Sequence, residues 1–330
     1  MSRTTITDIA YRLNVTPSTV SRALSGNPRV KESTRLMIEK TAKEMGYERN
    51  LMAANLRKGV ADIVGIIVPR INRRFFGSVI SGAESILKEA GYTVIICQTH
   101  ERKEDEIQAL RTMVHNQVAG LLISHSIESS DGNHIIDVIG SHGIKLIQFD
   151  RVFSELPGAK IVNDNFNGAY IATCHLIENG YKKIGHLAGY MTTEHYRERI
   201  CGYKKALSDH GYKVDEQLIF YDSILRETGY ESARKAISMG CNAIYSAGDF
   251  SALGALEAAR DSGLSVPDKF GVVGTANEFF TGIMSPGLSS LEMSPKELGR
   301  RAAYAFLNNS NEKEIVKMEL IKRESSIRKI

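Results

Sequence analysis

Across residues 61–330, short apolar runs alternate with longer amphipathic segments, and this alternation constrains the fold more than any other feature of the chain. An apolar run of four to eight residues followed by a helical segment is typical of a strand–helix unit in a parallel sheet. The first series has runs at 63–68, 93–97, 118–123 and 144–149, with helical segments near 76–90, 103–116 and 131–142. This series predicts an α/β lobe.

A second series of the same kind follows after about residue 160. Its runs lie at 184–188, 217–221, 242–246 and 270–274, and its helical segments near 166–179, 199–210, 228–239 and 250–262. The repeat predicts two lobes, each a doubly wound parallel sheet. Ligands of such sheets bind beyond the carboxyl ends of the strands, so we expect one binding site in the cleft between the lobes.

The first sixty residues differ from this body in charge. Residues 1–60 contain 11 Lys or Arg and 5 Asp or Glu, whereas residues 61–330 contain 31 and 33. The formal net charge of +4 therefore comes from the amino-terminal segment alone. A small basic segment on a nearly neutral body indicates a nucleic-acid-binding head.

Two short helices separated by a tight turn are predicted in this head. Thr5 and Asp8 have the spacing of a capping box, and the apolar periodicity that follows ends at Asn14. After the turn, Thr16 can cap a second helix over about 17–24, with Pro17 at its first position, where the missing N–H costs nothing. The pair forms a helix-turn-helix.

The second helix of such a unit enters the major groove of DNA. Its polar face carries Ser18, Thr19 and Arg22, and Arg22 can donate two hydrogen bonds to guanine, which contributes about 1–3 kcal/mol of discrimination. The hydroxyls of Thr5, Thr19 and Ser21 suit phosphate oxygens. The pattern alone leaves open that these residues only cap a helix pair that binds no DNA.

The segment TITDIAYRLNVTPSTVSRALSGNPRVKESTR, followed by GYERNLMAANLRKG, strongly resembles the DNA-binding head of the LacI/GalR family of transcription regulators. The resemblance implies a third helix over about 31–45 that ends at Gly46. The residues expected to face the helix pair are Met37, Ile38, Thr41, Ala42 and Met45. Where the family often has Ser or Thr as the cap of this helix, the chain has Lys31, so the cap is either weaker or shifted to Ser33.

Residues 50–58 read as a helix that is capped by Asn50 and is too short to be stable alone in water. The resemblance identifies it as a hinge helix that folds when paired with a second copy on DNA, with Leu56 wedged into the minor groove. Core packing is the alternative role for Leu56.

Asn50, Ala53 and Arg57 of this segment are also expected to contact DNA, as are Thr16 and Pro17 at the start of the second helix. Ala53 and Ala54 allow two such helices to approach closely, and Arg57 and Lys58 suit phosphates. Ala54 departs from the family, which frequently has Arg there, so one backbone contact is expected to be lost.

The resemblance continues through the body. It rests on FDRV at 149–152, VNDN at 162–165, RERICGYKKAL at 197–207, GDFSALGAL at 248–256, VVGTANE at 272–278 and LIKRESS at 320–326. It implies a periplasmic-binding-protein-like effector domain whose chain crosses between lobes near 161, 290 and 318, with a last helix over about 294–308 in the first lobe.

The resulting division has a helix-turn-helix domain, a hinge and linker, and an effector-binding domain of two lobes. These parts are expected at residues 1–49, 50–60 and 61–330, with lobe one at about 61–161 and 291–318 and lobe two at about 162–290 and 319–330.

Candidate effector contacts lie at the matched strand ends of this domain. Phe75 and Phe76 can form an apolar wall for a sugar ring or a base, and Asp150 ends the fourth strand. Arg199 and Asp249 are expected to begin second-lobe helices, and Asn277 follows the strand that ends at Gly274.

Some of these residues have plainer alternatives. Asp249 can be a helix cap, and Asp150 can be a partner of Arg151. Gly248 and Ala276 stand where the family commonly has Asn and Asp, and both departures remove polar anchors from the cleft.

Other functional classes find little support. The sequence has no phosphate loop, dinucleotide-binding glycine motif, nucleophile elbow or zinc-protease motif, so neither a catalytic residue nor a cofactor or metal is expected. The nine His residues are dispersed, and His175 and His186 are expected to pack or cap. The four Cys residues, which are far apart, are expected to be reduced and buried.

The sequence also shows neither an export signal nor a membrane span, so a cytoplasmic protein is expected. The leading hypothesis is a homodimeric regulator, expected to be a repressor, that binds a pseudo-palindromic operator and is controlled by a small molecule, expected to be a sugar or sugar derivative. The alternative is a solute-binding protein of a sugar transporter, which the basic head argues against.

Overall fold

The computed structural model describes residues 4–47 and 61–328. The chain divides into two compact units, Met1–Gly59 and Val60–Ile330, which are described separately below. Over residues 4–47 the small unit holds three helices, α1 (Ile6–Leu13), α2 (Pro17–Leu24) and α3 (Glu32–Glu44).

The first two helices begin and end where the sequence predicts. Thr5 forms the capping box with Asp8, and Asn14 ends α1 in the left-handed conformation at φ 51°. The Thr16 side chain accepts a hydrogen bond from the backbone N–H of Thr19, and Pro17 opens α2. Local hydrogen-bonding residues thus set the turn between the two helices.

The third helix differs from the prediction in two details. Lys31 precedes it without a side-chain hydrogen bond to the helix, so the cap is weak and is not supplied by Ser33. Met37 was expected to face the helix pair, but 44% of it is exposed, because Ile38, Thr41 and Ala42 turn the buried face of α3 away from it. Ile38 and Ala42 pack with Ile9, Ala10, Val20 and Ala23 in the core of the small unit.

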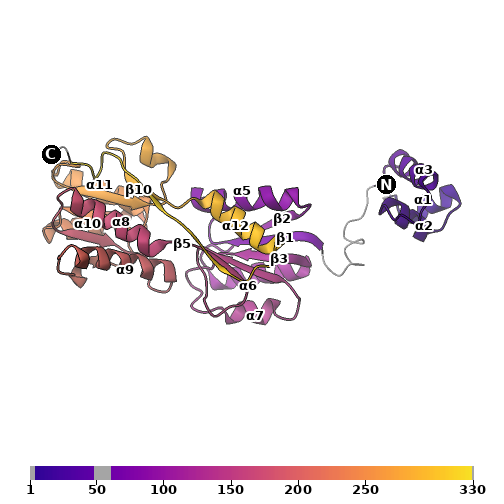
Figure 1. Ribbon diagram of the computed structural model, residues 1–330, viewed down its shortest axis with the longest axis horizontal. Coiled ribbons are helices and arrows are strands. Elements are labelled where there is room, and N and C mark those ends of the chain that lie inside the picture. Colours follow the sequence, from indigo (N-terminus) through magenta and orange to yellow (C-terminus); the bar gives the residue numbers. More distant parts are fainter. Residues whose placement is uncertain (1–3, 48–60, 329–330) are drawn as a thin grey trace. The chain divides into compact units, whose positions relative to one another are not determined.

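The large unit contains two six-stranded sheets. The first has the order β11-β5-β4-β3-β1-β2, and all its neighbouring strands are parallel. The second has the order β12-β10-β9-β8-β6-β7, and β12 alone pairs antiparallel. The predicted fold class, two doubly wound α/β lobes, is confirmed (Figure 1).

The first lobe has helices on both faces of its sheet: α5 and α12 pack together on one face, and α6 and α7 lie on the other (Figure 1). Its elements are β1 (Ala61–Val68), α5 (Arg74–Glu89), β2 (Thr93–Gln98), α6 (Lys103–His115), β3 (Val118–Ile123), α7 (Asn133–Ile139), β4 (Lys145–Phe149), β5 (Ala159–Asn163), α12 (Pro295–Leu307) and β11 (Lys313–Val316).

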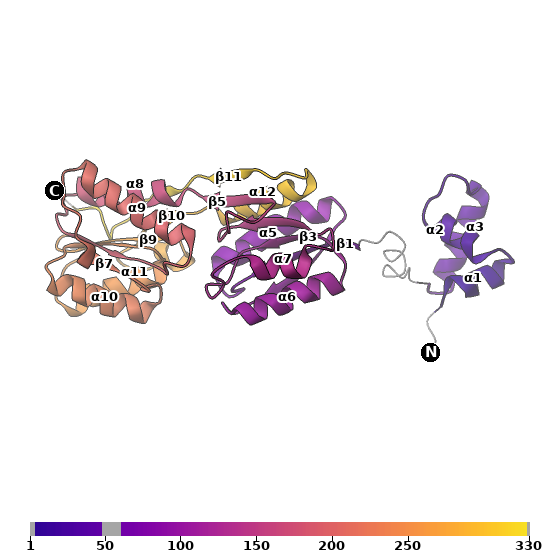
Figure 2. The ribbon, with the colours of Figure 1, turned by 90° about the horizontal axis from the view of Figure 1, so that it is seen from below.

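The second lobe repeats this arrangement, with the pairs α8–α9 and α10–α11 on opposite faces (Figure 2). Its elements are α8 (Asn165–Glu178), β6 (Ile184–Leu187), α9 (Glu194–Asp209), a 3₁₀ helix (Glu216–Leu218), β7 (Ile219–Phe220), α10 (Arg226–Ser238), β8 (Ala243–Ser246), α11 (Asp249–Asp261), β9 (Gly271–Thr275), a 3₁₀ helix (Phe279–Gly282), β10 (Ser289–Glu292) and β12 (Glu319–Ile321).

The chain passes between the lobes three times. It crosses from β5 to α8, from β10 to α12, and from β11 to β12. The apolar runs did not predict β5, β10, β11 or β12. The run at 217–221 holds a strand only at β7 (Ile219–Phe220), because residues 217 and 218 belong to the 3₁₀ helix before it.

Three helix pairs of the large unit pack through glycines that lack room for a side chain. A Cβ on Gly82 of α5 would lie 2.1 Å from the Lys296 carbonyl oxygen, and one on Gly299 of α12 would lie 2.0 Å from that of Val79. Gly202 of α9 and Gly254 of α11 meet backbone oxygens equally closely. These glycines let the backbones of paired helices come into contact.

Two further expectations concern cysteines and membrane helices. The four Cys residues form no disulfide, and Cys241 is buried as expected. Cys97 and Cys174 are only partly buried, and Cys201 on α9 is exposed, so the expectation of a buried thiol is wrong for Cys201. Within residues 4–47 and 61–328, helices long and apolar enough to span a bilayer are absent.

Candidate functional sites

The exposed side of α2 in the small unit is polar. Thr16, Pro17, Ser18 and Arg22 are exposed, and Thr19 and Ser21 are partly buried. Among the described residues, Arg22 has no carboxylate within ion-pair distance. An exposed guanidinium without an ion-pair partner, on the second helix of a helix-turn-helix, can donate two hydrogen bonds to the edge of a guanine.

The hydroxyls at the start of α2 form a cluster. Thr16 Oγ1 lies 2.8 Å from Ser18 Oγ and 2.9 Å from Thr19 Oγ1. The Thr16 hydroxyl is also the helix cap, which is the alternative role that the sequence pattern leaves open. These groups surround the amino terminus of α2, where backbone N–H groups and the helix dipole favour a phosphate oxygen.

The Thr5 hydroxyl is more constrained. It donates to the Asp8 carboxylate at 2.7 Å and accepts from the Asp8 backbone N–H at 3.3 Å. The carboxylate also accepts from the Thr5 backbone N–H at 2.8 Å, and the hydrogen bonds from the Thr5 hydroxyl and this N–H lower the pKa of Asp8. A phosphate contact by Thr5 therefore has to compete with its cap.

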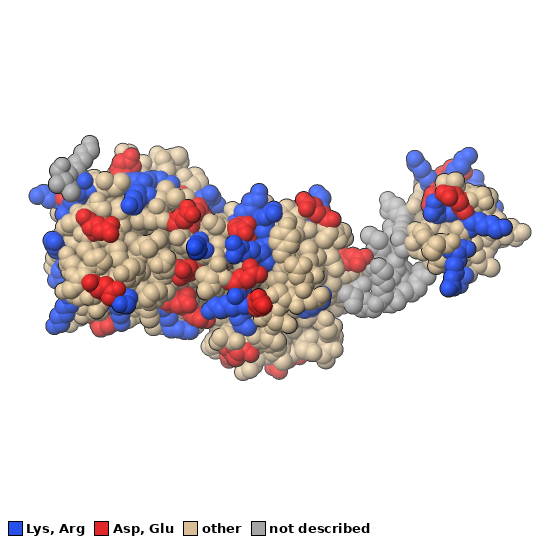
Figure 3. Space-filling model, in the orientation of Figure 1, with Lys and Arg blue, Asp and Glu red and all other residues tan. Residues whose placement is uncertain are grey.

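Basic side chains are prominent on the face of the small unit drawn in Figure 3. The four remaining DNA-binding candidates, Asn50, Ala53, Leu56 and Arg57, lie outside the described residues.

The second candidate site is a cleft of about 150 Å³ between the lobes of the large unit. Its lining contains five of the six predicted effector contacts: Phe75, Phe76, Asp150, Arg199 and Asp249. The lining residues follow the carboxyl ends of strands in both sheets, as expected for doubly wound sheets. The volume is below the roughly 300–1,000 Å³ of pockets for drug-sized ligands, so the cleft suits a small ligand.

The aromatic wall comes from the first turn of α5. The rings of Phe75 and Phe76 lie edge to face with centroids 5.1 Å apart, and both side chains are buried. The sequence prediction of an apolar wall on the first lobe agrees with this placement.

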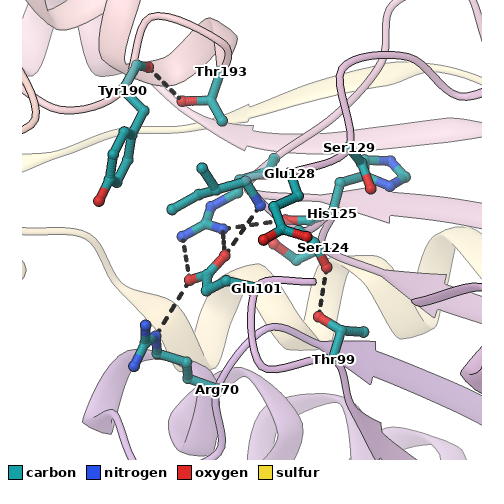
Figure 4. Close-up of polar contacts among 12 residues, drawn as sticks. Arg70, Thr99, Glu101, Ser124, His125, Glu128, Ser129, Tyr190 and Thr193 are labelled. Atoms are coloured by element: carbon teal, nitrogen blue, oxygen red, sulfur yellow. Dashed lines mark hydrogen bonds and ion pairs between the residues drawn. The ribbon is translucent and has the colours of Figure 1, made fainter. Parts of the chain in front are cut away.

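A carboxylate that the sequence did not single out organises the first-lobe side of the cleft. Glu101 accepts hydrogen bonds from Arg151 at 2.6 Å, from the Ile127 backbone N–H at 3.1 Å and from Arg70 at 3.4 Å. These partners follow β4, β3 and β1, and Glu101 itself follows β2, so one side chain joins the ends of four strands. Figure 4 shows the Glu101 carboxylate between Arg70 and the β3–α7 segment.

Asp150 lies beside this network. Its carboxylate accepts from the Ser124 hydroxyl at 3.3 Å and lies 4.0 Å from Arg151 Nε. Burial raises the pKa of Asp150 above its usual value, although Arg151 and Arg199 oppose the shift. Arg151 has its shorter contacts with Glu101, so the expected Asp150–Arg151 pair is the weaker one.

Arg199 lies in the second turn of α9 rather than at its start, because the helix begins at Glu194. It is 4% exposed and donates to the Asn165 side-chain oxygen at 2.9 Å and to the Ala247 carbonyl at 2.7 Å. Both acceptors are neutral. Among the described residues, Arg199 has no ion-pair partner.

His195, one turn before Arg199, also lines the cleft and is not among the contacts predicted from the sequence. It is 5% exposed, and its Nδ1 has no hydrogen-bond partner among the described residues. Burial and the nearby Arg199, Arg151 and Arg197 hold the pKa of His195 well below its usual value, so the ring is neutral.

Asp249 is the first residue of α11, as predicted, and Gly248 is the cap. Its carboxylate accepts from the Ser290 hydroxyl at 2.6 Å and from the Glu278 backbone N–H at 2.7 Å. Burial raises the pKa of Asp249 to about 7. The side chain thus ties α11 to β10 and to the segment after β9, which is a structural role in addition to lining the cleft.

Asn277 is the predicted contact that the structure places outside the cleft lining. Its side-chain oxygen accepts from Arg323 at 2.8 Å, and its amide donates to Glu292 at 2.9 Å. The left-handed backbone at Ala276 and Asn277 turns this side chain toward β10.

Non-glycine residues with positive φ gather at the cleft. Glu101, Asp150 and Ala276 have φ of 70°, 59° and 106°, and each follows a strand and lines the cleft. Such conformations cost about 1–3 kcal/mol each and persist where the surrounding structure enforces them. Their position is typical of a binding site.

Both units of the chain match known protein families. Residues 5–50 match the family described as bacterial regulatory proteins, lacI family, and residues 61–324 match periplasmic binding proteins and the sugar binding domain of the LacI family. The chain is 28% identical over 333 residues to the HTH-type transcriptional regulator RegA of Clostridium saccharobutylicum, covering 98% of this chain and 99% of that one.

It is also 30% identical over 331 residues to the NTD biosynthesis operon regulator NtdR of Bacillus subtilis, again covering 98% and 99% of the two chains. Among solved structures, the Lac repressor dimer bound to operator and the anti-inducer ONPF aligns with a TM-score of 0.87 at 21% identity, over 99% of this chain and all of that one. A complex of the regulator CelR with cellobiose aligns with a TM-score of 0.74 at 24% identity, over 98% and 100%.

Proposed function

The chain belongs to the LacI family of bacterial regulatory proteins, and we propose that it is a repressor that binds a pseudo-palindromic operator as a homodimer and is controlled by a small molecule in the cleft. As a family member it is a DNA-binding transcription regulator and not an enzyme. The proposed effector is a sugar or a sugar derivative.

One observation carries this proposal: a single chain joins an exposed, arginine-bearing second helix of a helix-turn-helix to a two-lobed unit with a cleft lined by both lobes. Arg22 and the hydroxyls at the start of α2 suit base edges and phosphates respectively. The aromatic wall, the carboxylates and the arginines of the cleft suit a small polyhydroxylated ligand.

The proposed mechanism is a shift between two conformations of the large unit. An effector that contacts both lobes favours one angle between them, because it binds that arrangement more tightly. The segment 50–60 joins the large unit to the DNA-binding helices, and the proposed hinge helix would transmit the change. Effector binding would then alter operator affinity.

The proposal is tested by measuring DNA binding at fixed salt with the full chain and with a chain that lacks residues 1–60. A specific site, selected from genomic DNA, should bind the full chain as a dimer and not the truncated one. Unchanged affinity after the deletion would overturn the proposal. Leu56→Ala should weaken specific binding more than binding to random DNA, since the wedge acts at one base step.

A further inference from the structure

The arginines of the cleft exceed the carboxylates that pair with them. Four arginines line the cleft, and Glu101 forms ion pairs with two of them, Arg70 and Arg151. Arg73 and Arg199 have no ion-pair partner among the described residues. The two come from opposite lobes, Arg73 from the residue before α5 and Arg199 from α9.

The direct contacts of these two arginines are with neutral groups, and their charges interact with the carboxylates of Asp150 and Glu278 without forming an ion pair. Arg199 is buried and donates to an amide oxygen and a backbone carbonyl. The Arg73 guanidinium lies 3.9 Å from the ring centroid of Phe250. A buried cation without a counter-charge is costly unless a ligand supplies one.

The remaining carboxylates of the cleft are hydrogen-bonded elsewhere or have a raised pKa. Asp249 accepts from Ser290 and from the Glu278 backbone. Burial raises the pKa of Asp249 to about 7 and also raises those of Asp150 and Glu278. Each carboxylate that binds a proton leaves the cleft more positive.

Two further groups favour a negative ligand. The amino terminus of α5 has no side-chain cap for its first N–H groups, and the cleft is lined by residues of this terminus, Arg73, Phe75 and Phe76, where the helix dipole favours negative charge. The buried His195 Nδ1 at the same cleft has no partner among the described residues, and the neutral tautomer that is protonated at Nδ1 can donate a hydrogen bond to an anionic oxygen.

We propose that the effector carries an anionic group, a carboxylate or a phosphate, and that Arg73 and the amino terminus of α5 select for it while Arg199 supplies a second positive charge. This inference rests on the proposed function, because it names the chemical class of the effector of that same cleft. An anion there would contact the first lobe through Arg73 and draw this side chain from Phe250 of the second lobe. Charge on the ligand is thereby coupled to the contact between the lobes.

The test uses the full chain and inorganic phosphate as the probe, with thermal unfolding followed in phosphate and in chloride at equal ionic strength. Wild type is compared with Arg73→Gln and with the control Arg111→Gln, which removes an exposed arginine of α6 far from the cleft lining. Phosphate also stabilises proteins by general exclusion from their surface, and that effect is common to all three chains.

Site-specific binding should appear as an extra stabilisation in wild type and Arg111→Gln. The apparent dissociation constant for phosphate should rise by roughly 10- to 100-fold in Arg73→Gln, the loss expected for a charge-assisted hydrogen bond. Equal stabilisation of all three chains would overturn the inference.

Three matched sugars, glucose, glucuronate and glucose 6-phosphate, then show whether the anionic group of the effector is a carboxylate or a phosphate. Stronger stabilisation by glucuronate indicates a carboxylate effector, and stronger stabilisation by glucose 6-phosphate indicates a phosphate. Stronger stabilisation by glucose than by either charged partner overturns the inference. A wild-type chain that binds its operator but shows no anion-specific effect would leave the proposed function standing, whereas the deletion of residues 1–60 tests that function separately.

Discussion

The guanidinium of Arg73 in the first lobe stacks on the ring of Phe250 in the second, 3.9 Å from its centroid. Because this contact joins the lobes beside the cleft, it should favour the present angle between them. We expect a coupling free energy of about 0.5–1 kcal/mol between Arg73→Ala and Phe250→Ala in a double-mutant cycle of urea unfolding. The pair Arg111→Ala and Phe250→Ala is the control and should be additive. Additivity of the first pair would show that the contact contributes no stability.

Glu101 should be the most sensitive charged residue of the cleft. Glu101→Gln leaves the Arg151 guanidinium, whose side chain is 9% exposed, without its carboxylate, and breaking such a buried pair costs about 3–5 kcal/mol. Glu257→Gln is the matched control, because its partner Arg226 is 53% exposed and an exposed pair contributes about 0–1 kcal/mol. Urea unfolding of both variants measures the difference. Equal losses would contradict the organising role of Glu101.

Asp249 should make stability depend on pH. Its pKa is about 7 in the folded chain and near 3.8 when exposed, so the folded state holds the proton more tightly. Its contribution is therefore largest at low pH and is lost as pH rises to about 7. Between pH 5 and 8 the free energy of unfolding should fall by about 2–3 kcal/mol from this group.

Asp249→Asn should remove that fall. An amide can still accept from the Glu278 N–H and donate to the Ser290 hydroxyl, so both hydrogen bonds persist. Unfolding of wild type and variant at several pH values makes the comparison. Parallel pH profiles of the two chains would show that Asp249 does not titrate in this range.

Arg22 should read a base. Arg22→Ala is expected to cost about 1–3 kcal/mol on the selected operator and to relax the preference at one base pair in each half-site. Arg12→Ala is the control, since Arg12 lies on α1 beside Glu44 and belongs to a different helix. Fluorescence anisotropy on operators with single base-pair changes gives both quantities. An equal loss on specific and random DNA would assign Arg22 to the phosphate backbone.

Gly82 and Gly77 of α5 should respond to alanine with opposite signs. A Cβ on Gly82 would meet the Lys296 carbonyl at 2.1 Å, so Gly82→Ala should cost about 1–3 kcal/mol through overpacking. Gly77 has open space around its Cα, so Gly77→Ala should stabilise the chain by about 0.5–1 kcal/mol through helix propensity. Thermal unfolding measures both. Stabilisation by Gly82→Ala would mean that α12 moves freely away from α5.

The parts of the fold that local patterns describe could be predicted from the sequence. Apolar runs located β1 to β4, and capping residues such as Thr5 and Thr16 located α1 and α2, because a buried strand and a helix cap leave their signals within a few residues. The short strands β11 and β12 could not be found in this way. The few residues of β11 gain order from pairing with β5, which lies some 150 residues earlier in the chain, and those of β12 from pairing with β10.

The same distinction holds for the cleft. Phe75, Phe76 and Asp150 follow predicted strands, and their positions at the cleft follow from that order. Glu101 sits in the charged run THERKED, at the start of the helical segment predicted near 103–116, and its residue types do not mark it as a cleft residue. Only the tertiary structure brings Arg70, Arg151 and the β3–α7 segment around its carboxylate.

The three crossings between the lobes mean that neither lobe is encoded by a contiguous stretch of the gene. A breakpoint for recombination between β5 and β11 would separate two strands that are neighbours in the first sheet. A stop codon between β11 and β12 would remove the edge strand β12 from the second sheet. The small unit ends before the first of these crossings. New specificities can therefore be assembled by exchanging the DNA-binding head as a cassette, whereas the sensor has to be inherited whole and changed by point substitution.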